Sequence, residues 1–544
     1  MSTVLPTTAD AIVASLLAHG VDTVFGIPGV QTYELFDAIA RTGGRIRLIA
    51  PRHEQAAGYM AYGYARSTGR VGVFSVVPGP GVLNAAAAIC TGYGSSVPML
   101  CLTGQVPAAF IGSGMGHLHE LPDQLATLRS LTKWAGRIEH TSDAPTLMAE
   151  AFRQATSGRP RPVAIEVPWD VFGTRAPAPP AFVAAPIASP APEPSAIAKA
   201  VQLLHGAARP MIMVGSGAYG ASQPVRVLAE HLQAPVVSFR GGKGVLAADH
   251  PLSFTCGEGF ELWSDTDVVV GIGSRMELQW FRWPDQRGGL KVINIDIDPM
   301  QAVRLKSDVA IVADAAIGGE ALFTALAADS PPRPDRTQEL QQLKLRMAAQ
   351  FRTVQPYLGY LDAIRAALPR DGFFVEESCQ IGFASYYGLA SYEPRTFVSG
   401  GHQGNLGFGF PSALGVKVGN PHRAVVSVTG DGGFQFGLQE LITAANYAIN
   451  LVTVVFDNGA YGNVRRDQNR LYDGRMIGSE LVNPDFVAIA EASHVRARMV
   501  ASPAELGVAL TEALSIAAPS LLVVQLDDRE ASTPWPYLMP RSRR

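Results

Sequence analysis

Two short polar motifs end consecutive apolar runs in the last third of the chain. Gly430-Asp431-Gly432 follows the first run and Asp457-Asn458 follows the second, with a helical stretch at 438–449 between the runs. This order predicts strand, crossover helix and strand, and parallel strands joined in this way end at the same edge of a sheet. We therefore expect Asp431 and Asn458 side by side at the carboxyl edge, where open α/β sheets bind ligands.

The residue types in these motifs suit a metal ion and an anion. A carboxylate and an amide oxygen are hard ligands, and Mg²⁺ takes few such ligands from protein and the rest from phosphates and water. The flanking glycines Gly430 and Gly432 allow the backbone to approach an anion closely. The motifs therefore predict a site for magnesium and a diphosphate.

Length and composition exclude several classes of protein. A chain of 544 residues predicts about three domains, and a hydrophobic content of 47% with 17% charged residues indicates a globular protein. The net charge of −3 gives no basic face for nucleic acid, and no apolar run reaches about 18 residues, so no membrane span is expected. Four scattered cysteines and an N-terminus without a signal-peptide pattern indicate a cytoplasmic protein with reduced thiols.

Two proline-rich stretches divide the chain into three parts. They lie at 176–194 and 330–336 and predict domains at 1–175, 190–330 and 355–535. Strands and helices alternate in each part, so the predicted fold class is α/β, with three doubly wound parallel-sheet domains. The strands expected before the third part lie at 22–26, 46–50, 72–76, 98–103, 162–167, 210–214, 267–273 and 290–298.

Glu54 is a second candidate for chemistry. It begins a helical stretch, 54–66, that follows the strand 46–50 and carries small and aromatic residues with little charge. Such surroundings remove water from a carboxylate, which is typical of catalytic acids. The alternative is a glutamate that simply stabilises the first turn of its helix through the helix dipole.

The paired motifs resemble the signature of thiamine diphosphate enzymes, and the three α/β parts are similar in order to the acetolactate synthase, pyruvate oxidase and benzaldehyde lyase-like branch. The resemblance covers nearly the whole chain. It implies a pyrimidine-binding first domain, a central domain and a diphosphate-binding third domain. Asp457 stands where the family has asparagine. Asp431, Asn458 and the backbone carbonyl of Ala460 would be the magnesium ligands.

The resemblance makes Glu54 catalytic, because the segment around it is similar to the one that holds the family's catalytic glutamate. That glutamate hydrogen-bonds N1′ of the cofactor's aminopyrimidine, and the cofactor then acts as an electron sink. The family's glutamate acts across a subunit interface. The resemblance therefore implies a homodimer or homotetramer.

Further cofactor-binding residues are implied by family motifs. Leu406 would hold the bent shape of the cofactor, although on its own it also fits an ordinary core residue. The stretch 377–381 resembles a loop that touches the diphosphate and also fits a plain turn. The remaining cofactor positions are Gly79 and Asn84 near the pyrimidine and Ser378, Cys379, Gln380, Gly430, Gly432, Gly433, Tyr461 and Gly462 near the diphosphate.

The substrate pocket is where the sequence departs from its relatives. Acetolactate synthases have Phe-Gln-Glu where this chain has Leu118-His119-Glu120. A histidine can transfer protons near neutral pH, so His119 is a candidate catalytic residue, with loop histidines bonded to the backbone as the alternative. Val30 and His117 would line the pocket, and Gln105 is a further catalytic candidate through its Thr-Gly-Gln pattern.

The central part offers only weak signals for a nucleotide. Gly215 to Gly220 fits G-x-G-x-x-G, but the acidic residue Glu230 comes too early for a nicotinamide site. The flavin-binding stretch of the family is replaced by 273–283, which makes FAD doubtful, although the stretch 294–298 survives.

These observations predict a thiamine diphosphate- and Mg²⁺-dependent enzyme that cleaves or forms a carbon–carbon bond next to a carbonyl. The predicted reaction is decarboxylation of a 2-oxo acid, after which the acyl fragment is released or joined to a second carbonyl compound, as in acetolactate synthase. The alternative is cleavage of a 2-hydroxy ketone by a lyase of the benzaldehyde lyase type. Two readings of other classes are an inactive homologue and a nicotinamide dehydrogenase. An inactive homologue predicts the loss of Glu54 or Asp431, and both are present.

Overall fold

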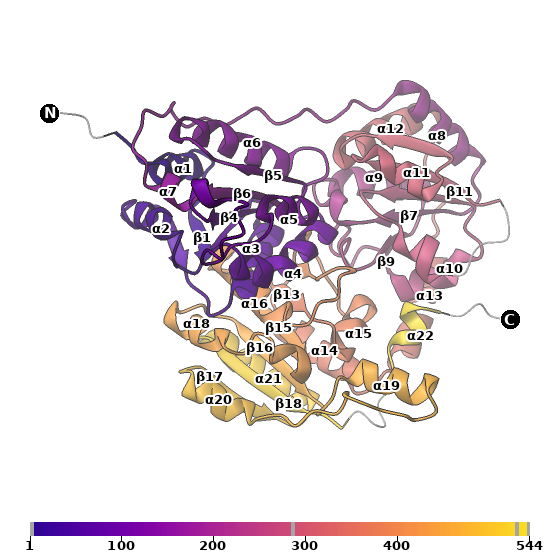
Figure 1. Ribbon diagram of the computed structural model, residues 1–544. Helices are drawn as coiled ribbons and strands as arrows, with labels where there is room; N and C mark the ends of the chain where they lie inside the picture. The colour runs from indigo at the N-terminus through magenta and orange to yellow at the C-terminus, as the bar shows by residue number, and fades with distance from the viewer. Residues whose placement is uncertain (1–4, 284–288, 528–531, 541–544) are drawn as a thin grey trace.

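Three parallel six-stranded sheets, each packed between helices, build the molecule in a computed structural model (Figure 1). The structure describes residues 5–283, 289–527 and 532–540. The predicted α/β fold with three doubly wound sheets is confirmed. The segment 176–193 contains neither helix nor strand and runs along the outside from the first sheet to the second.

The first sheet has the strand order β2-β1-β3-β4-β6-β5, and all neighbours are parallel. Its strands are β1 (Thr23–Gly26), β2 (Arg47–Ile49), β3 (Gly72–Val76), β4 (Met99–Gln105), β5 (Trp134–Arg137) and β6 (Val163–Pro168). Its helices are α1 (Thr8–Ala18), α2 (Tyr33–Ala40), α3 (Glu54–Thr68), α4 (Pro80–Ser95), α5 (Gln124–Leu131), α6 (Ala144–Thr156) and α7 (Trp169–Phe172), with 3-10 turns η1 (Ala108–Phe110) and η2 (Thr141–Asp143).

The central sheet has the order β12-β11-β10-β7-β8-β9. Its strands are β7 (Pro210–Val214), β8 (Val236–Ser238), β9 (Ser253–Thr255), β10 (Val268–Ile272), β11 (Lys291–Asp296) and β12 (Val309–Val312). Its helical elements are α8 (Pro194–Gly206), η3 (Ser216–Ala218), α9 (Ser222–Leu232), α10 (Cys256–Trp263), η4 (Leu278–Arg282), α11 (Pro299–Leu305) and α12 (Ala315–Asp329). Helix α13 (Thr337–Phe351) follows and leads to the third sheet.

The third sheet has the order β14-β13-β15-β16-β18-β17. Its strands are β13 (Phe373–Glu376), β14 (Phe397–Val398), β15 (Val425–Gly430), β16 (Val452–Asp457), β17 (Arg496–Val500) and β18 (Ser520–Gln525). Its helices are α14 (Tyr357–Ala367), α15 (Gln380–Gly388), α16 (Gly409–Gly419), α17 (Asp431–Phe434), α18 (Glu440–Asn446), α19 (Gly462–Leu471), α20 (Phe486–Ala492), α21 (Pro503–Ser515) and α22 (Trp535–Leu538).

The strands expected from the sequence are present with ends shifted by one or two residues. Strands β8, β9, β12, β14, β17 and β18 were not predicted, and neither was β5, which lies at the edge of the first sheet. Its sequence Trp134-Ala-Gly-Arg137 contains a glycine and no β-branched residue, so its propensity for a strand is weak. Pairing with β6 provides the stability that its own sequence lacks.

Helices α3 and α16 cross in very close contact and join the first sheet to the third. A Cβ atom on Gly63 would lie 1.9 Å from the carbonyl oxygen of Ser412, and one on Gly415 would lie 1.9 Å from that of Met60. Only glycine permits backbones to approach so closely. Residues 56–67 of α3 are all buried, in a core that both sheets share. This crossing sets where Glu54, at the start of α3, stands in the molecule.

Among the described residues, no helix combines the length and the apolar character that a membrane span needs. The four cysteines are free thiols. Cys101 and Cys256 are buried, and Cys90 and Cys379 are partly buried.

Candidate active site

Asp431 and Asn458 lie at the carboxyl ends of two neighbouring strands. β15 and β16 pair in parallel with Gly430 opposite Phe456, so the residues that follow them emerge at one edge of the sheet. Asp431 is 1% exposed, and its Oδ2 accepts a hydrogen bond of 3.2 Å from the backbone N–H of Ala460. Oδ1 of Asn458 accepts from the same N–H at 3.2 Å. The two predicted ligand side chains therefore converge on one backbone amide.

Asn483 completes this cluster and was not found from the sequence. Its Nδ2 donates to Oδ2 of Asp431 at 2.6 Å and to Oδ1 of Asp457 at 2.7 Å. Nε2 of Gln435 in turn donates to Oδ1 of Asn483 at 2.8 Å. The asparagine side chain thus fixes both carboxylates that end the two strands. It lies in an irregular stretch far along the chain, where no motif marks it.

The residues of this cluster fit a divalent cation. Burial raises the pKa of Asp431 above its ordinary value, the neighbouring carboxylate of Asp457 adds to this rise, and hydrogen bonds from Asn483 oppose it. A cation bound beside Asp431 would remove the cost of burying its charge. No group of three or more His, Cys, Asp or Glu gathers for a metal among the residues that the structure describes, as expected for an ion that takes few protein ligands.

A cavity of about 380 Å³ opens beside Asp431 and Asn458. Helix α15 begins at its wall, where Cys379 and Gln380 line the cavity, and the positive end of a helix dipole favours an anion at such a place. The side-chain oxygen Oε1 of Gln380 is buried there without a partner. The cavity gathers, besides Asp431 and Asn458, the sequence-predicted residues Ser378, Cys379, Gln380, Leu406, Gly430, Gly432, Gly433, Ala460, Tyr461 and Gly462.

Glu377 anchors the loop that carries Leu406. Its buried carboxylate accepts from the backbone N–H of Gly407 at 2.5 Å, from that of Gly409 at 3.1 Å, and from the hydroxyl of Thr429 at 2.8 Å. The carboxylate of Glu377 therefore holds both the loop that follows Leu406 and the end of β15. The sequence marks Glu377 only as part of a loop, because its partners lie 30 and more residues away along the chain.

We expect Glu377→Gln to destabilise the protein in a pH-dependent way. Replacing an acceptor by an amide leaves buried N–H donors unpaired, at a cost of about 1–3 kcal/mol. Burial raises the pKa of Glu377 from 4.5 to about 7, so between these values the folded protein keeps a proton that the unfolded chain has lost. Wild-type stability from this group therefore falls as the pH rises to about 7, and glutamine cannot titrate. Thermal unfolding should show the deficit of the variant shrinking from pH 5 to pH 7.5; a deficit independent of pH would contradict this.

Glu54 is not among the residues that line this cavity. It is half-buried at the start of α3, and its Oε2 accepts from Nδ2 of Asn84 at 3.0 Å. His53 caps the same helix by accepting from the N–H of Gln55. The described residues that line the cavity are Arg240 and residues between 357 and 526, so none comes from the first domain. The structure brings Glu54 together with Asn84 but leaves it outside the cavity of its own chain.

The remaining candidates lie along the carboxyl edge of the first sheet. Nδ1 of His119 lies 2.8 Å from Oε1 of Gln31, and a Cβ on Gly79 would lie 2.5 Å from the carbonyl oxygen of His119. Val30 is half-buried beside Gln31, and the ring of His117 packs on Phe110 with centroids 4.0 Å apart.

Gln105 has a different setting from the one expected of a catalytic residue. It is 3% exposed, its Nε2 lies 3.3 Å from Oε2 of the buried Glu166, and its Oε1 accepts from the N–H of Val106 at 2.8 Å. Glu166 also binds Arg137 at 2.6 Å and Gln124 at 2.8 Å. This network engages both ends of the amide of Gln105, and its catalytic role stays a prediction.

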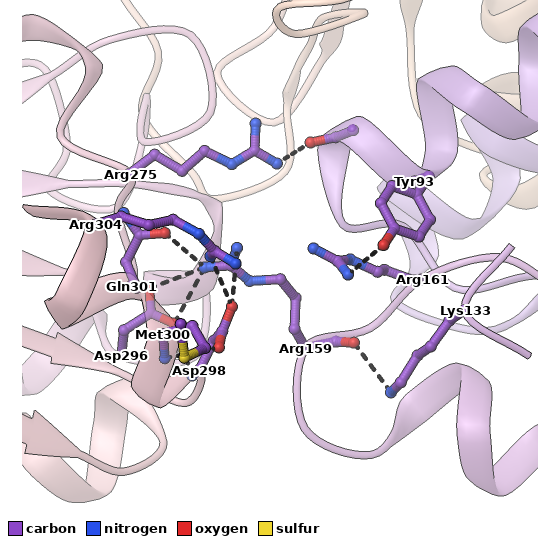
Figure 2. Close-up of polar contacts among 11 residues, drawn as sticks. Tyr93, Lys133, Arg159, Arg161, Arg275, Asp296, Asp298, Met300, Gln301 and Arg304 are labelled. Carbon is purple, nitrogen blue, oxygen red and sulfur yellow. Dashed lines mark hydrogen bonds and ion pairs between the residues drawn. The ribbon is translucent and has the colours of Figure 1, made fainter. Parts of the chain in front are cut away.

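The central sheet adjoins a second cavity, of about 450 Å³, where the three domains meet. A Cβ on Gly215 would lie 2.3 Å from the carbonyl oxygen of Gly273, so these glycine turns pack against each other. Figure 2 shows Arg159 of the first domain reaching Asp296, the last residue of β11, and Asp298 just after it. It lies 3.3 Å from Asp296 and 3.4 Å from Asp298.

Asp296 and Asp298 are therefore both paired with an arginine of the first domain. After β8, where a nicotinamide site requires an acidic residue, the chain carries Arg240, which pairs with Glu277. This removes the structural basis of the dehydrogenase reading. The doubt about FAD stays a prediction.

Three family models match the chain in the order of its three sheets. They are the N-terminal thiamine pyrophosphate-binding domain at residues 6–127, the central domain at 197–322 and the C-terminal thiamine pyrophosphate-binding domain at 378–524 of thiamine pyrophosphate enzymes. The chain therefore belongs to the thiamine pyrophosphate enzymes, whose cofactor is also called thiamine diphosphate.

Within that family the chain is similar to decarboxylases and synthases. It is 37% identical over 500 residues, 89% of this chain and 88% of the relative, to the probable 2-ketoarginine decarboxylase of Pseudomonas aeruginosa. It is 33% identical to the probable acetolactate synthase large subunit of Methanocaldococcus jannaschii over 96% of this chain and 92% of that one. The solved thiamine diphosphate-dependent 4-hydroxybenzoylformate decarboxylase of Rhodococcus jostii matches with a TM-score of 0.82 and 25% identity, over 96% of this chain and 99% of that one.

Proposed function

We propose that the chain is a Mg²⁺- and thiamine diphosphate-dependent enzyme that decarboxylates a 2-oxo acid. The acyl fragment that remains is protonated to an aldehyde or joined to a second carbonyl compound. The main support is the cavity at the carboxyl edge of the third sheet, where a buried carboxylate, an amide oxygen, glycine turns and a helix N-terminus meet. The names of the relatives add support for 2-oxo acids as substrates.

Each group of residues has a separate task in this proposal. Asp431, Asn458 and the carbonyl of Ala460 hold Mg²⁺, and the glycine turns and the start of α15 bind the diphosphate. Leu406 would support the bent shape of the bound cofactor, and the carboxyl of Glu54 would hold a proton at N1′ of the pyrimidine. Bound thiamine diphosphate supplies the carbanion that attacks the carbonyl and the electron sink that accepts the charge.

The substrate test is a turnover assay followed by proton NMR. Purified protein with thiamine diphosphate and Mg²⁺ is incubated with pyruvate, 2-ketoarginine or 4-hydroxybenzoylformate, the last two suggested by the names of relatives. An aldehyde as sole product indicates a decarboxylase, and acetolactate or acetoin from pyruvate indicates a carboligase. Cleavage of a 2-hydroxy ketone without turnover of any 2-oxo acid would overturn the proposal in favour of a lyase.

We also propose that two copies of the chain form each working site. Glu54 lies outside the cavity of its own chain, and large apolar side chains stay exposed beside both parts. Leu83, next to Asn84, is 50% exposed, and Phe436, which contacts the Leu406 loop, is 51% exposed. A second copy that brings its first domain to this cavity would cover both residues. The proposal includes the soluble, cytoplasmic homodimer or homotetramer expected from the sequence.

Subunit complementation tests the shared site. Glu54→Gln and Asp431→Ala chains, each inactive alone, are expected to regain about a quarter of wild-type activity when co-expressed in equal amounts. Half of the dimers are then mixed, and each mixed dimer contains one site with both native residues. Activity is measured together with the molar mass by light scattering. Mixed dimers without any activity would contradict a site shared between chains.

A further inference from the structure

Two neighbouring residues of the first domain adopt a backbone conformation that non-glycine residues rarely adopt. Gln31 has φ 74° and His119 has φ 67°, both in the left-handed region. Such strained conformations persist only where the surroundings enforce them, and they are often found at functional sites. Gln31 follows β1 and His119 lies in the loop after η1, so the two strained residues come from segments far apart in the chain. Their side chains are in direct contact.

The hydrogen bonds of Gln31 determine which atom of His119 carries the proton. Nε2 of Gln31 lies 2.7 Å from the carbonyl oxygen of Leu118, which can only accept. The amide nitrogen therefore faces Leu118, and the amide oxygen Oε1 faces Nδ1 of His119 at 2.8 Å. Because Oε1 can only accept, Nδ1 must donate its proton. The alternative orientation of the amide would place oxygen against oxygen.

Gln31 is held rigidly enough to impose this arrangement. It is 2% exposed, and a Cβ on Gly104, at the end of β4, would lie 2.3 Å from its carbonyl oxygen. On the other side, the backbone of His119 packs against Gly79. The backbone N–H groups of Gly114, Gly116 and His117 donate to the carboxylate of Glu120, which fixes the loop next to His119.

We propose that Gln31 is a positioning residue that locks His119 in the neutral form protonated on Nδ1, so that Nε2 is the proton acceptor of the active site. The inference rests on the proposed function. Partial burial lowers the pKa of His119, which favours the neutral ring, and the charge of Glu54 opposes this shift. Within the described parts of the chain, Nε2 of His119 has no hydrogen-bond partner. Its lone pair is therefore free for a substrate.

The proton transfer assigned to Nε2 balances over one turnover. Release of the product carbonyl would break the O–H bond of the former substrate carbonyl and the bond that holds its carbon to the cofactor. The proton would move to Nε2, the O–H electron pair would become the second carbon–oxygen bond, and the electron pair of the broken carbon bond would stay with the cofactor. The resulting imidazolium returns the proton to the carbonyl oxygen of the next substrate as that carbonyl is attacked. Nδ1 keeps its proton throughout because Gln31 continues to accept from it.

The first test measures the tautomer of His119 directly and needs no turnover. In holoenzyme labelled with ¹³C-histidine, the ring carbon shifts distinguish a proton on Nδ1 from one on Nε2, and the His119→Gln spectrum identifies the signal. We expect the Nδ1-protonated form in the wild type and its loss in Gln31→Leu. A signal of the Nε2-protonated form in the wild type would overturn the proposal, whatever the substrate of the enzyme is.

The second test is a kinetic double-mutant cycle. Gln31→Leu is expected to lower kcat about 10²-fold with little change in KM or in thiamine diphosphate binding, as loss of one acid–base group does. Gln31→Glu keeps an acceptor for Nδ1 but sets an oxygen against the carbonyl of Leu118, so it should recover only part of kcat. In a His119→Gln background, Gln31→Leu should have little further effect, because Gln31 acts through His119. Full additivity of the two losses would overturn the proposal.

A matched control variant distinguishes the positioning role of Gln31 from the loss of activity that replacing any strained glutamine would cause. Gln233, with φ 48° at the end of α9, lies in the central domain and also hydrogen-bonds through both ends of its amide. Gln233→Leu should leave kcat at the wild-type value. If Gln233→Leu lowered kcat as much as Gln31→Leu, the effect would be structural and the proposal would fail. If no variant or wild type turned over any 2-oxo acid, the proposed function would fail while the tautomer test still stood.

Discussion

Glu54→Gln is expected to lower kcat by about 10²–10⁴-fold, the range lost when a positioned acid–base group is removed. Glutamine has the same size and can still accept a hydrogen bond from Asn84, whose Nδ2 lies 3.0 Å from Oε2 of Glu54. It cannot hold an exchangeable proton at N1′ of the bound pyrimidine. Diphosphate binding should remain, because the cavity of the same chain has no residue of the first domain in its described lining.

The measurement compares initial rates of 2-oxo acid turnover with thiamine diphosphate affinity from isothermal titration calorimetry. Glu505→Gln is the matched control, because Glu505 also occupies the first turn of a helix, α21, and is exposed. This control tests the alternative that Glu54 only stabilises the first turn of its helix. Full activity of Glu54→Gln would refute the assignment of this residue. An equal loss in both variants would assign the effect to helix stability.

Asp431→Ala should weaken thiamine diphosphate binding in the presence of Mg²⁺ by at least about 100-fold, since even partners that only support a metal ligand contribute 10–100-fold. Asp431 is buried, and its carboxylate receives only N–H donors, from Asn483 and Ala460, in the described structure. Removing it takes away the negative charge that a cation requires. The protein without cofactor should not lose stability by losing this charge, because burial already raises the pKa of Asp431.

Thermal unfolding with and without cofactor measures this difference. At a thiamine diphosphate concentration 100 times the dissociation constant of the wild type, binding stabilises the wild type by about 2.7 kcal/mol. A variant with 100-fold weaker binding gains only about 0.4 kcal/mol at the same concentration. Asp371→Ala is the control, because Asp371 is exposed at the opposite edge of the same sheet, before β13. Unchanged affinity in Asp431→Ala would rule out the proposed metal site.

The local pattern of the chain was sufficient to predict the pairing of Asp431 and Asn458. Two apolar runs separated by a helical stretch must form parallel strands that end together, so the polar residues after them meet. The structure places both residues on the amide of Ala460. The α/β class was predicted in the same way, because strands and helices alternate along the chain and each of them is marked by a local pattern of apolar residues.

Contacts between distant segments were decided only by the tertiary structure. Asn483 lies 52 residues from Asp431, Glu377 lies 30 residues from Gly407, and His119 lies 88 residues from Gln31. None of these pairs has a spacing that a helix or strand imposes, so no periodicity in the sequence marks them. The burial of Gln105 in the network of Glu166 is of the same kind.

The sequence by itself therefore determined the fold class and the placement of Asp431 and Asn458 at one edge of the third sheet, because connection rules turn local patterns into positions at a sheet edge. The tertiary structure decided which side chains hold these groups in place and which ring nitrogen of His119 is free. It also separated Glu54 from the cavity of its own chain. The physical reason is that packing of α3 against α16 sets the relative positions of the first and third sheets, and this packing depends on residues 350 positions apart.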